Sequence, residues 1–217
     1  MKLINQKLLF FVLFVSLGLA ALQVPLVHLA GSKAQFTLFD SFGPVAGAFL
    51  GSLPGAAAVL IMQITNFLMH GSQVLDAGSI IRFIPMMFAT LYFAKQNKLN
   101  WIVPVFAILV FNLHPVGRSV WYYSMFWLIP VVCYFWQDKF ILARSLGATF
   151  MAHAAGGAIW IWVFHLPESV WISLIPIVIV ERLLFACGMA VCYLALKNIL
   201  DNVWAGKELY EVHTDQD

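Results

Sequence analysis

The adjacent charges Glu181 and Arg182 lie in the middle of a long apolar stretch, SLIPIVIVERLLFACGMAVCYLALK. A charge at that depth in a membrane segment costs about 3 kcal/mol on insertion scales, so it is expected to serve a function or to have a buried partner. Neighbouring residues on a helix point about 100° apart, and the two side chains therefore face different surroundings. We expect one of them to neutralise a charge on a bound ligand. A structural ion pair with another helix is the alternative.

The preceding apolar stretch, TFMAHAAGGAIWIWVFHLPESVW, carries a histidine, a glycine and a tryptophan on one helical face. His153, Gly157 and Trp160 are spaced by four and three residues, which places them one above another. Gly157 would leave room for a flat ligand, Trp160 would stack on that ligand and His153 would hydrogen-bond it. The alternative for His153 is a packing histidine that hydrogen-bonds a neighbouring helix.

A third group of polar and aromatic residues occurs in LVFNLHPVGRSVWYY. An aromatic-lined pocket would use Asn112 and His114 as hydrogen-bonding groups and Trp121 as a second stacking surface. These aromatic residues could instead form an interfacial belt at the membrane surface. Together the three groups predict an outward-facing pocket for a small, partly aromatic, polar molecule.

Motifs for catalysis are missing from the sequence. There is no HExxH, no GxSxG, no phosphate loop and no paired-carboxylate motif. The histidines match no compact metal-ligand spacing, so we predict no metal site and no cofactor. We therefore expect a binding protein that is not an enzyme, and any active transport would draw on an ion gradient or on a partner.

The composition identifies the solvent that surrounds these residues. The chain has 217 residues, of which 62% are hydrophobic and 10% are charged, with a mean hydropathy of +0.89. Ordinary soluble domains carry about 25% charged residues. The formal net charge of +2 is too small to suggest nucleic-acid binding. We predict an all-α, polytopic membrane helix bundle in contact with lipid.

Seven apolar segments are candidates for its helices, and two of them are marginal. They cover approximately residues 8–30, 42–68, 79–94, 101–113, 119–136, 141–164 and 170–197. Lys and Arg near segment ends favour the cytoplasm, and most of them fall inside if the broken 42–68 stretch fails to cross. This predicts about six crossings with both termini cytoplasmic. Seven crossings with an external N-terminus fit almost as well. Residues 1–200 then form the transmembrane domain, and 201–217 form a short acidic cytoplasmic tail.

One of these segments contains glycines at a spacing of four residues. These are Gly43, Gly47, Gly51 and Gly55. On a continuous helix this spacing makes a groove where another backbone can approach closely, so we predict a helix-packing face. Pro44 and Pro54 lie within the same stretch and predict a bent or discontinuous segment.

The stretches FTLFDSFGPVAGAFLGSLPGAAAVLI and GSIIRFIPMMFATLYFAK, after a first helix and before about 100 residues of further helices, resemble the substrate-binding S component of an energy-coupling factor transporter. The resemblance implies a six-helix protein of the prokaryotic cell membrane that captures a vitamin or related micronutrient. It would work with a transmembrane coupling subunit and two cytoplasmic ATPases. The resemblance also makes Asp40 and Phe42 candidates for a lid, and Ser16 and Ala20 the counterpart of a small-residue coupling motif on the first helix.

Two functions of other kinds are compatible with the same segments. A membrane scaffold, such as the cell-shape proteins with this helical layout, would use the glycine groove as a partner interface and would need no pocket. A metal-ion uptake component would require histidines to cluster at one point. Buried charges around a cavity would discriminate against the scaffold.

Overall fold

The computed structural model describes residues 2–28, 35–71 and 77–203. Its elements in chain order are α1 (Lys2–Ala21), β1 (Pro25–His28), β2 (Gln35–Thr37), α2 (Phe39–Phe42), η1 (Gly43–Val45), α3 (Ala46–Leu50), α4 (Ser52–Asn66), η2 (Phe67–Gly71), α5 (Ala77–Ile81), α6 (Phe83–Ala94), α7 (Leu99–Leu113), α8 (Pro115–Ser119), η3 (Trp121–Leu128), α9 (Ile129–Tyr134), α10 (Ile141–Phe164) and α11 (Glu168–Val203). The all-α class is confirmed. The predicted acidic tail, 201–217, begins within α11, and its residues after 203 lie outside the described part of the chain.

The first apolar stretch differs from the expectation of one helix to about residue 30. Helix α1 ends at Ala21, and the chain continues into the antiparallel ribbon of β1 and β2. Pro25 explains the early end, because proline has no amide hydrogen and disfavours helical backbone at the residue before it. Val27 pairs with Phe36, and His28 pairs with Gln35. The ribbon matters for function because it carries His28 and Phe36 to the site described below.

Three described helices are long and apolar enough to cross a membrane by length and composition. They are Ser52–Met69, Ile141–Phe164 and Glu168–Asn202, and shorter apolar helices occur at Leu8–Ala21, Phe83–Ala94 and Leu99–Leu113. The 42–68 stretch, which we expected not to cross the membrane, therefore contains one of the three long helices, Ser52–Met69. Within these spans 61% of α10 is buried inside the protein, against 33% of the other two, so α10 is the central helix.

The glycine segment is discontinuous, as its prolines predicted, but the expected single groove is wrong. Gly51 has φ 89° and ψ 169°, a conformation open almost only to glycine, and it separates α3 from α4. The chain folds back there, so a Cβ on Gly55 would meet the Ala46 backbone at 2.9 Å. A Cβ on Gly47 would instead collide with the Thr90 carbonyl oxygen of α6. The glycines thus allow two separate close approaches in place of one continuous face.

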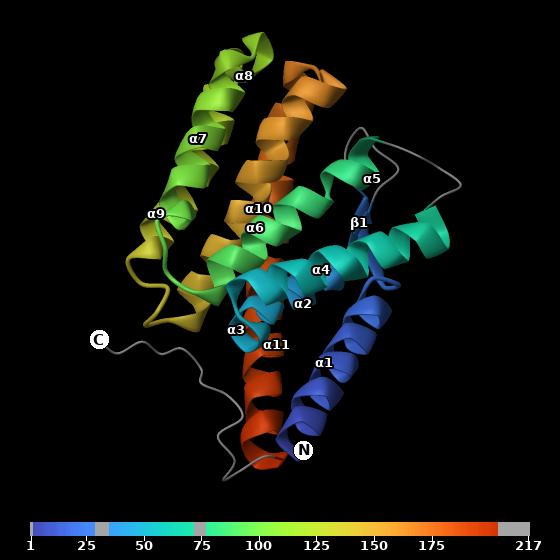
Figure 1. The fold of residues 1–217 in the computed structure, drawn as a ribbon. Helices are drawn as coiled ribbons and strands as arrows, with labels where there is room; N and C mark the ends of the chain where they lie inside the picture. The colour runs from blue at the N-terminus through green and yellow to red at the C-terminus, as the bar shows by residue number, and fades with distance from the viewer. Residues whose placement is uncertain (1, 29–34, 72–76, 204–217) are drawn as a thin grey trace.

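Residues 119–136 also differ from the predicted helix. This stretch contains the 3₁₀ segment η3, followed by the short helix α9, and both pack against α7. Figure 1 shows α8 at one end of α7 and α9 near the other, so the chain turns back at residues 114–120. The turn follows from Pro115, which ends α7 two residues earlier and starts α8.

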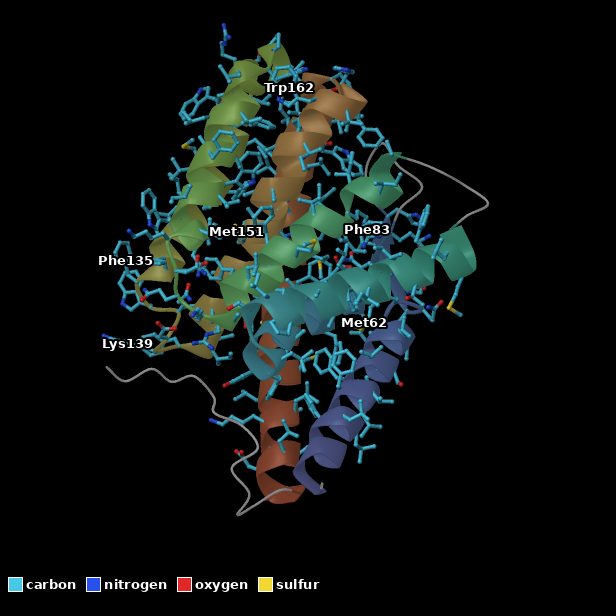
Figure 2. All side chains as sticks on the ribbon, in the orientation of Figure 1. Met62, Phe83, Phe135, Lys139, Met151 and Trp162 are labelled. Carbon is cyan, nitrogen blue, oxygen red and sulfur yellow. The ribbon has the colours of Figure 1, made fainter. Side chains whose placement is uncertain are left out.

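Helix α10 packs against α6, α7, α9 and α11, and the buried side chains form three clusters around it. Figure 2 shows Met62 and Met151 between helices, whereas Phe135 and Trp162 are exposed. The cluster formed by α7, η3, α10 and α11 is the most aromatic and includes Phe111, Trp127 and Trp171. This aromatic cluster supports one wall of the site.

Candidate functional site

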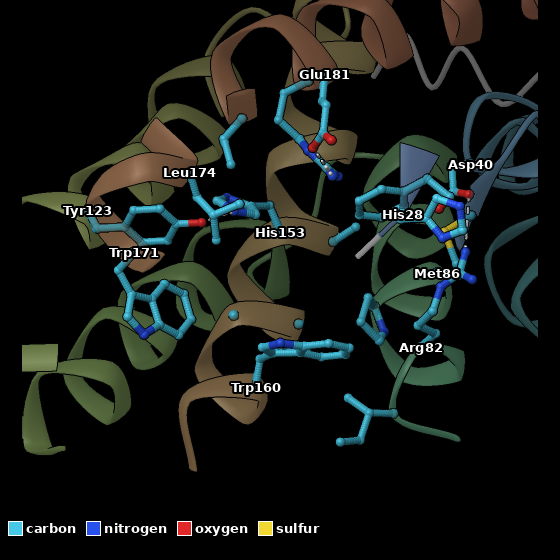
Figure 3. Close-up of a pocket in the computed structure, with 18 residues that line it drawn as sticks. His28, Asp40, Arg82, Met86, Tyr123, His153, Trp160, Trp171, Leu174 and Glu181 are labelled. Atoms are coloured by element: carbon cyan, nitrogen blue, oxygen red, sulfur yellow. Dashed lines mark hydrogen bonds and ion pairs between the residues drawn. The ribbon is translucent and has the colours of Figure 1, made fainter. Parts of the chain in front are cut away.

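A cavity of about 120 Å³ lies between α10, α11, η3, the α5–α6 region and the β ribbon. Six residues singled out in the sequence line it, namely Asp40, His153, Gly157, Trp160, Glu181 and Arg182. They come from α2, α10 and α11. Figure 3 shows Asp40, His153, Trp160 and Glu181 around one space, together with side chains that the sequence did not single out. The tertiary fold thus brings together residues separated by as many as about 140 positions.

His153 is held in one orientation by two aromatic side chains. The indole nitrogen Nε1 of Trp127 donates to His153 Nδ1 at 3.0 Å, and the Tyr123 hydroxyl lies 3.0 Å from His153 Nε2. Tryptophan is only a donor, so Nδ1 must be unprotonated, and the neutral imidazole carries its hydrogen on Nε2. His153 therefore donates to the Tyr123 oxygen, which leaves the Tyr123 hydrogen to point elsewhere.

Trp160 forms the aromatic surface of the cavity. It is 8% exposed, and its ring stacks on Phe164 with centroids 4.2 Å apart. Figure 3 shows its indole at the opposite edge of the view from Glu181. Gly157 does not offer the open surface that the sequence suggested for a flat ligand, because a Cβ there would lie 2.6 Å from the Trp127 ring. The glycine instead makes room for Trp127.

Asp40 connects the ribbon to the α5–α6 region. Its Oδ2 accepts a hydrogen bond from the Thr37 backbone amide at 2.7 Å and lies 3.3 Å from Nη2 of Arg82. Asp40 is 6% exposed, so this pairing compensates for the removal of its carboxylate from water. The predicted lid residue is therefore fixed by local bonds at the edge of the cavity.

Arg182 is almost completely buried, at 4% exposure, yet its hydrogen bonding is poor. Nη1 lies 3.5 Å from the Thr149 hydroxyl, Nη2 lies 3.6 Å from Glu181, and Nε has no partner among the described residues. The expectation that Glu181 and Arg182 serve different neighbours is wrong, because their flexible side chains meet despite the angle between them. The guanidinium also lies over the Phe36 ring, 4.6 Å from its centroid.

The residues of the 112–121 region lie away from the cavity, contrary to the prediction. Asn112 donates to Ile108 and Ser124, and Trp121 is 55% exposed. His114 packs beside Trp162 and His165 at the end of α7. Asn112 and His114 lie at the far end of α7, and Trp121 begins the 3₁₀ segment η3, in which Tyr123 is the residue that lines the cavity.

The other predicted residues serve packing or face outwards. Phe42 stacks on Phe14 with centroids 4.6 Å apart, inside a core cluster and not at the cavity. Ser16 and Ala20 lie on the exposed side of α1 together with Leu13 and Leu17. They therefore make no helix-packing face within this chain, and their place leaves them accessible to a partner or to lipid.

Sequence reasoning missed several residues that line the cavity, chiefly His28, Phe36, Arg82, Tyr123 and Trp171. Arg82 carried a signal, since it is a charge between two apolar segments. Phe36 carried none, because only the ribbon brings its ring to Arg182. Among the described residues, no group of three or more His, Cys, Asp or Glu side chains is placed to hold a metal ion.

The chain is similar to an uncharacterized protein of Methanocaldococcus jannaschii. The two are 24% identical over 241 aligned positions, which cover 94% of this chain and 80% of that protein. No protein-family model matches the chain, and no solved structure does. The functional argument therefore depends on the geometry of the cavity.

Proposed function

We propose that this protein is a membrane-embedded binding component for the uptake of a small micronutrient-like molecule. The observation that carries the proposal is the cavity that unites an oriented histidine, an indole surface and a buried guanidinium from α10 and α11. Such a combination of apolar walls with a few convergent polar groups is typical of ligand sites. The proposal is one of binding without chemical conversion of the ligand.

The cavity size limits what is bound. An engineered cavity of about 150 Å³ holds a benzene molecule. The cavity here has about 120 Å³, so it accommodates a group of roughly one six-membered ring. A larger ligand would have to extend out of the cavity past the ribbon. This size favours a compact micronutrient over a multi-ring vitamin.

The uptake role rests on the resemblance to the S components of energy-coupling factor transporters. In that proposal the chain crosses a prokaryotic cell membrane about six times, and a transmembrane coupling subunit with cytoplasmic ATPases drives uptake. The exposed small residues Ser16 and Ala20 on α1 support a contact with such a subunit. Uptake in cells should then require the partner genes, whereas ligand binding should not.

Ligand binding by the purified protein tests the proposal. We expect a raised melting temperature with one member of a panel of vitamins and their single-ring precursors, and quenching of tryptophan fluorescence. Trp160→Ala should abolish both effects because it removes the aromatic surface. Trp162→Ala is the matched control, since Trp162 is two residues away on the same helix and 44% exposed. Absence of binding across the panel would favour the membrane scaffold.

The proposed topology has a separate test. Ser119 and Ser169 are exposed at one end of the α7–α10 bundle, and Asp138 is exposed at the other. In a background without the native cysteines, Ser119→Cys and Ser169→Cys should react with an impermeant thiol reagent in intact cells. Asp138→Cys should react only after the membrane is permeabilised. The reverse pattern would rule out the proposed orientation.

A further inference from the structure

The most unusual feature of the cavity is a buried guanidinium whose hydrogen-bonding capacity is largely unused. Arginine has five N–H donors and cannot lose its charge in proteins. In Arg182 the single hydrogen bond is 3.5 Å long, the ion pair spans 3.6 Å, and Nε has no partner among the described residues. A buried charge is stable only when its hydrogen bonds are met, so the unused donors indicate a missing acceptor.

A second donor faces the same space. Because His153 donates to the Tyr123 oxygen, the hydrogen of that hydroxyl has no acceptor among the described residues. Tyr123 is 2% exposed and lines the cavity, so its acceptor has to come from whatever fills the cavity. Figure 3 shows the Tyr123 hydroxyl beside His153. The Arg182 guanidinium and the Tyr123 hydroxyl therefore both have donor hydrogens without an acceptor among the described residues, and a ligand rich in acceptor atoms would satisfy them.

The charges in the wall decide how much negative charge the ligand can carry. Arg82 is already paired with Asp40, and Glu181 lies beside Arg182, so the four charges balance. A dianionic phosphate would be repelled by Glu181 more strongly than a monoanion, and it would lack a second free cation among the described residues. A planar carboxylate suits one guanidinium better, since it accepts two parallel N–H bonds and carries a single charge.

Resting on the binding function proposed above, we infer that the cavity binds a single-ring aromatic or heteroaromatic carboxylic acid. Arg182 and Tyr123 donate to its carboxylate, and the ring lies against the indole of Trp160. The ring follows from the cavity volume of about 120 Å³ and from the aromatic wall. The carboxylate follows from the unmet donors, and its single charge follows from the presence of one loosely paired guanidinium.

Wild-type protein alone provides the first test, through compounds of one shape and different charge. Benzoate, benzamide and benzylamine differ only in the group attached to the ring, so calorimetry or tryptophan fluorescence can compare the group directly. Benzoate should bind at least about tenfold more tightly than benzamide, because a charged acceptor meets the guanidinium. Acetate and inorganic phosphate complete the set. They test whether an anion is sufficient without the ring.

Two variants assign the contacts. Arg182→Met should weaken benzoate binding by about 30-fold or more and should remove the preference over benzamide. Tyr123→Phe should weaken it by about tenfold. The matched controls are Arg144→Met and Tyr92→Phe, which change the same residue types away from the cavity. Both controls should bind benzoate as the wild type does.

The outcomes separate this inference from the proposed function. Equal or tighter binding of benzamide or benzylamine overturns the carboxylate inference and leaves a ligand-binding protein in place. Tight binding of acetate or phosphate without benzoate overturns the requirement for a ring. Failure of the whole set and of the vitamin panel overturns both proposals. If Arg182→Met does not fold, the wild-type comparison and Tyr123→Phe still decide.

Discussion

Arg144 and Arg182 are two arginines in different regions, the first partly and the second almost completely buried, and their surroundings differ. Their side chains are 16% and 5% exposed. Arg144, in the first turn of α10, donates from Nε to the Gln137 carbonyl at 3.1 Å and from Nη2 to Asp138 at 2.9 Å. Arg182, in the middle of α11, has only long polar contacts with the described part of the chain, and its Nε has no partner there.

The difference shows that burial of a charged residue does not by itself identify a binding residue. Arg144 uses its donors to close the turn that begins α10, so the protein itself supplies the acceptors. Arg182 stays buried without equivalent acceptors, which costs stability unless a ligand provides them. The comparison therefore assigns a structural role to the first arginine and supports the ligand-binding role proposed for the second. Four predictions test this comparison.

The largest expected effect concerns stability without ligand. Arg144→Met should lower the free energy of unfolding by about 2 kcal/mol, because it removes two hydrogen bonds and leaves the Gln137 carbonyl unpaired. The double change Glu181→Gln and Arg182→Met should leave stability unchanged or raise it, because it removes a poorly bonded buried pair. Chemical denaturation of both variants in detergent checks this. A larger loss in the double variant would give Arg182 a structural role and break the comparison.

The next effect concerns the wall that orients His153. Gly157→Ala should lower the free energy of unfolding by about 1 kcal/mol net, since the clash with Trp127 outweighs the gain in helix propensity. Its neighbour Gly156 is the control. A Cβ there would lie 3.2 Å from Pro85 Cγ, so Gly156→Ala should be close to neutral. Equal destabilisation by the two changes would contradict the role given to Gly157.

A smaller effect is expected from the tautomer of His153. Trp127→Phe removes the donor to Nδ1, so the imidazole hydrogen can move there and Nε2 can accept from Tyr123. The Tyr123 hydrogen is then less available, and benzoate binding should weaken about threefold, a fraction of one hydrogen bond. Nitrogen chemical shifts of labelled His153 would report the tautomer. Trp136→Phe, at an exposed position, is the control and should alter neither property.

The smallest effect concerns His114, a buried group with an unpartnered Nδ1 outside the cavity. Burial lowers the pKa of His114, and His165 lowers it further. The neutral form is favoured in the folded state, so its contribution to stability is present above about pH 6.5, the ordinary histidine value, and is lost as the pH falls through the lowered pKa. His114→Asn should flatten this part of the pH profile without changing benzoate binding. Loss of binding would place His114 in the site.

Much of the fold could be predicted because it depends on local properties of the chain. Long apolar runs determine helices in an apolar solvent, since each helix satisfies its own backbone hydrogen bonds. Proline and glycine in the 42–68 stretch predicted a break, and Gly51 is where the break occurs. The unusual cost of burying Glu181, Arg182 and His153 in apolar segments drew attention to them without any knowledge of the fold.

The tertiary structure decided which of these residues meet. Asp40 and Arg82 are 42 positions apart and pair across the cavity edge, and the β ribbon brings Phe36 to Arg182. The helical phase of the 119–136 stretch also escaped prediction, because a 3₁₀ segment presents different side chains from an α-helix. The sequence by itself determined the costs of placing polar groups in apolar segments. Which partners compensate for those costs depends on the distances between segments, and only the packing of the helices sets these distances.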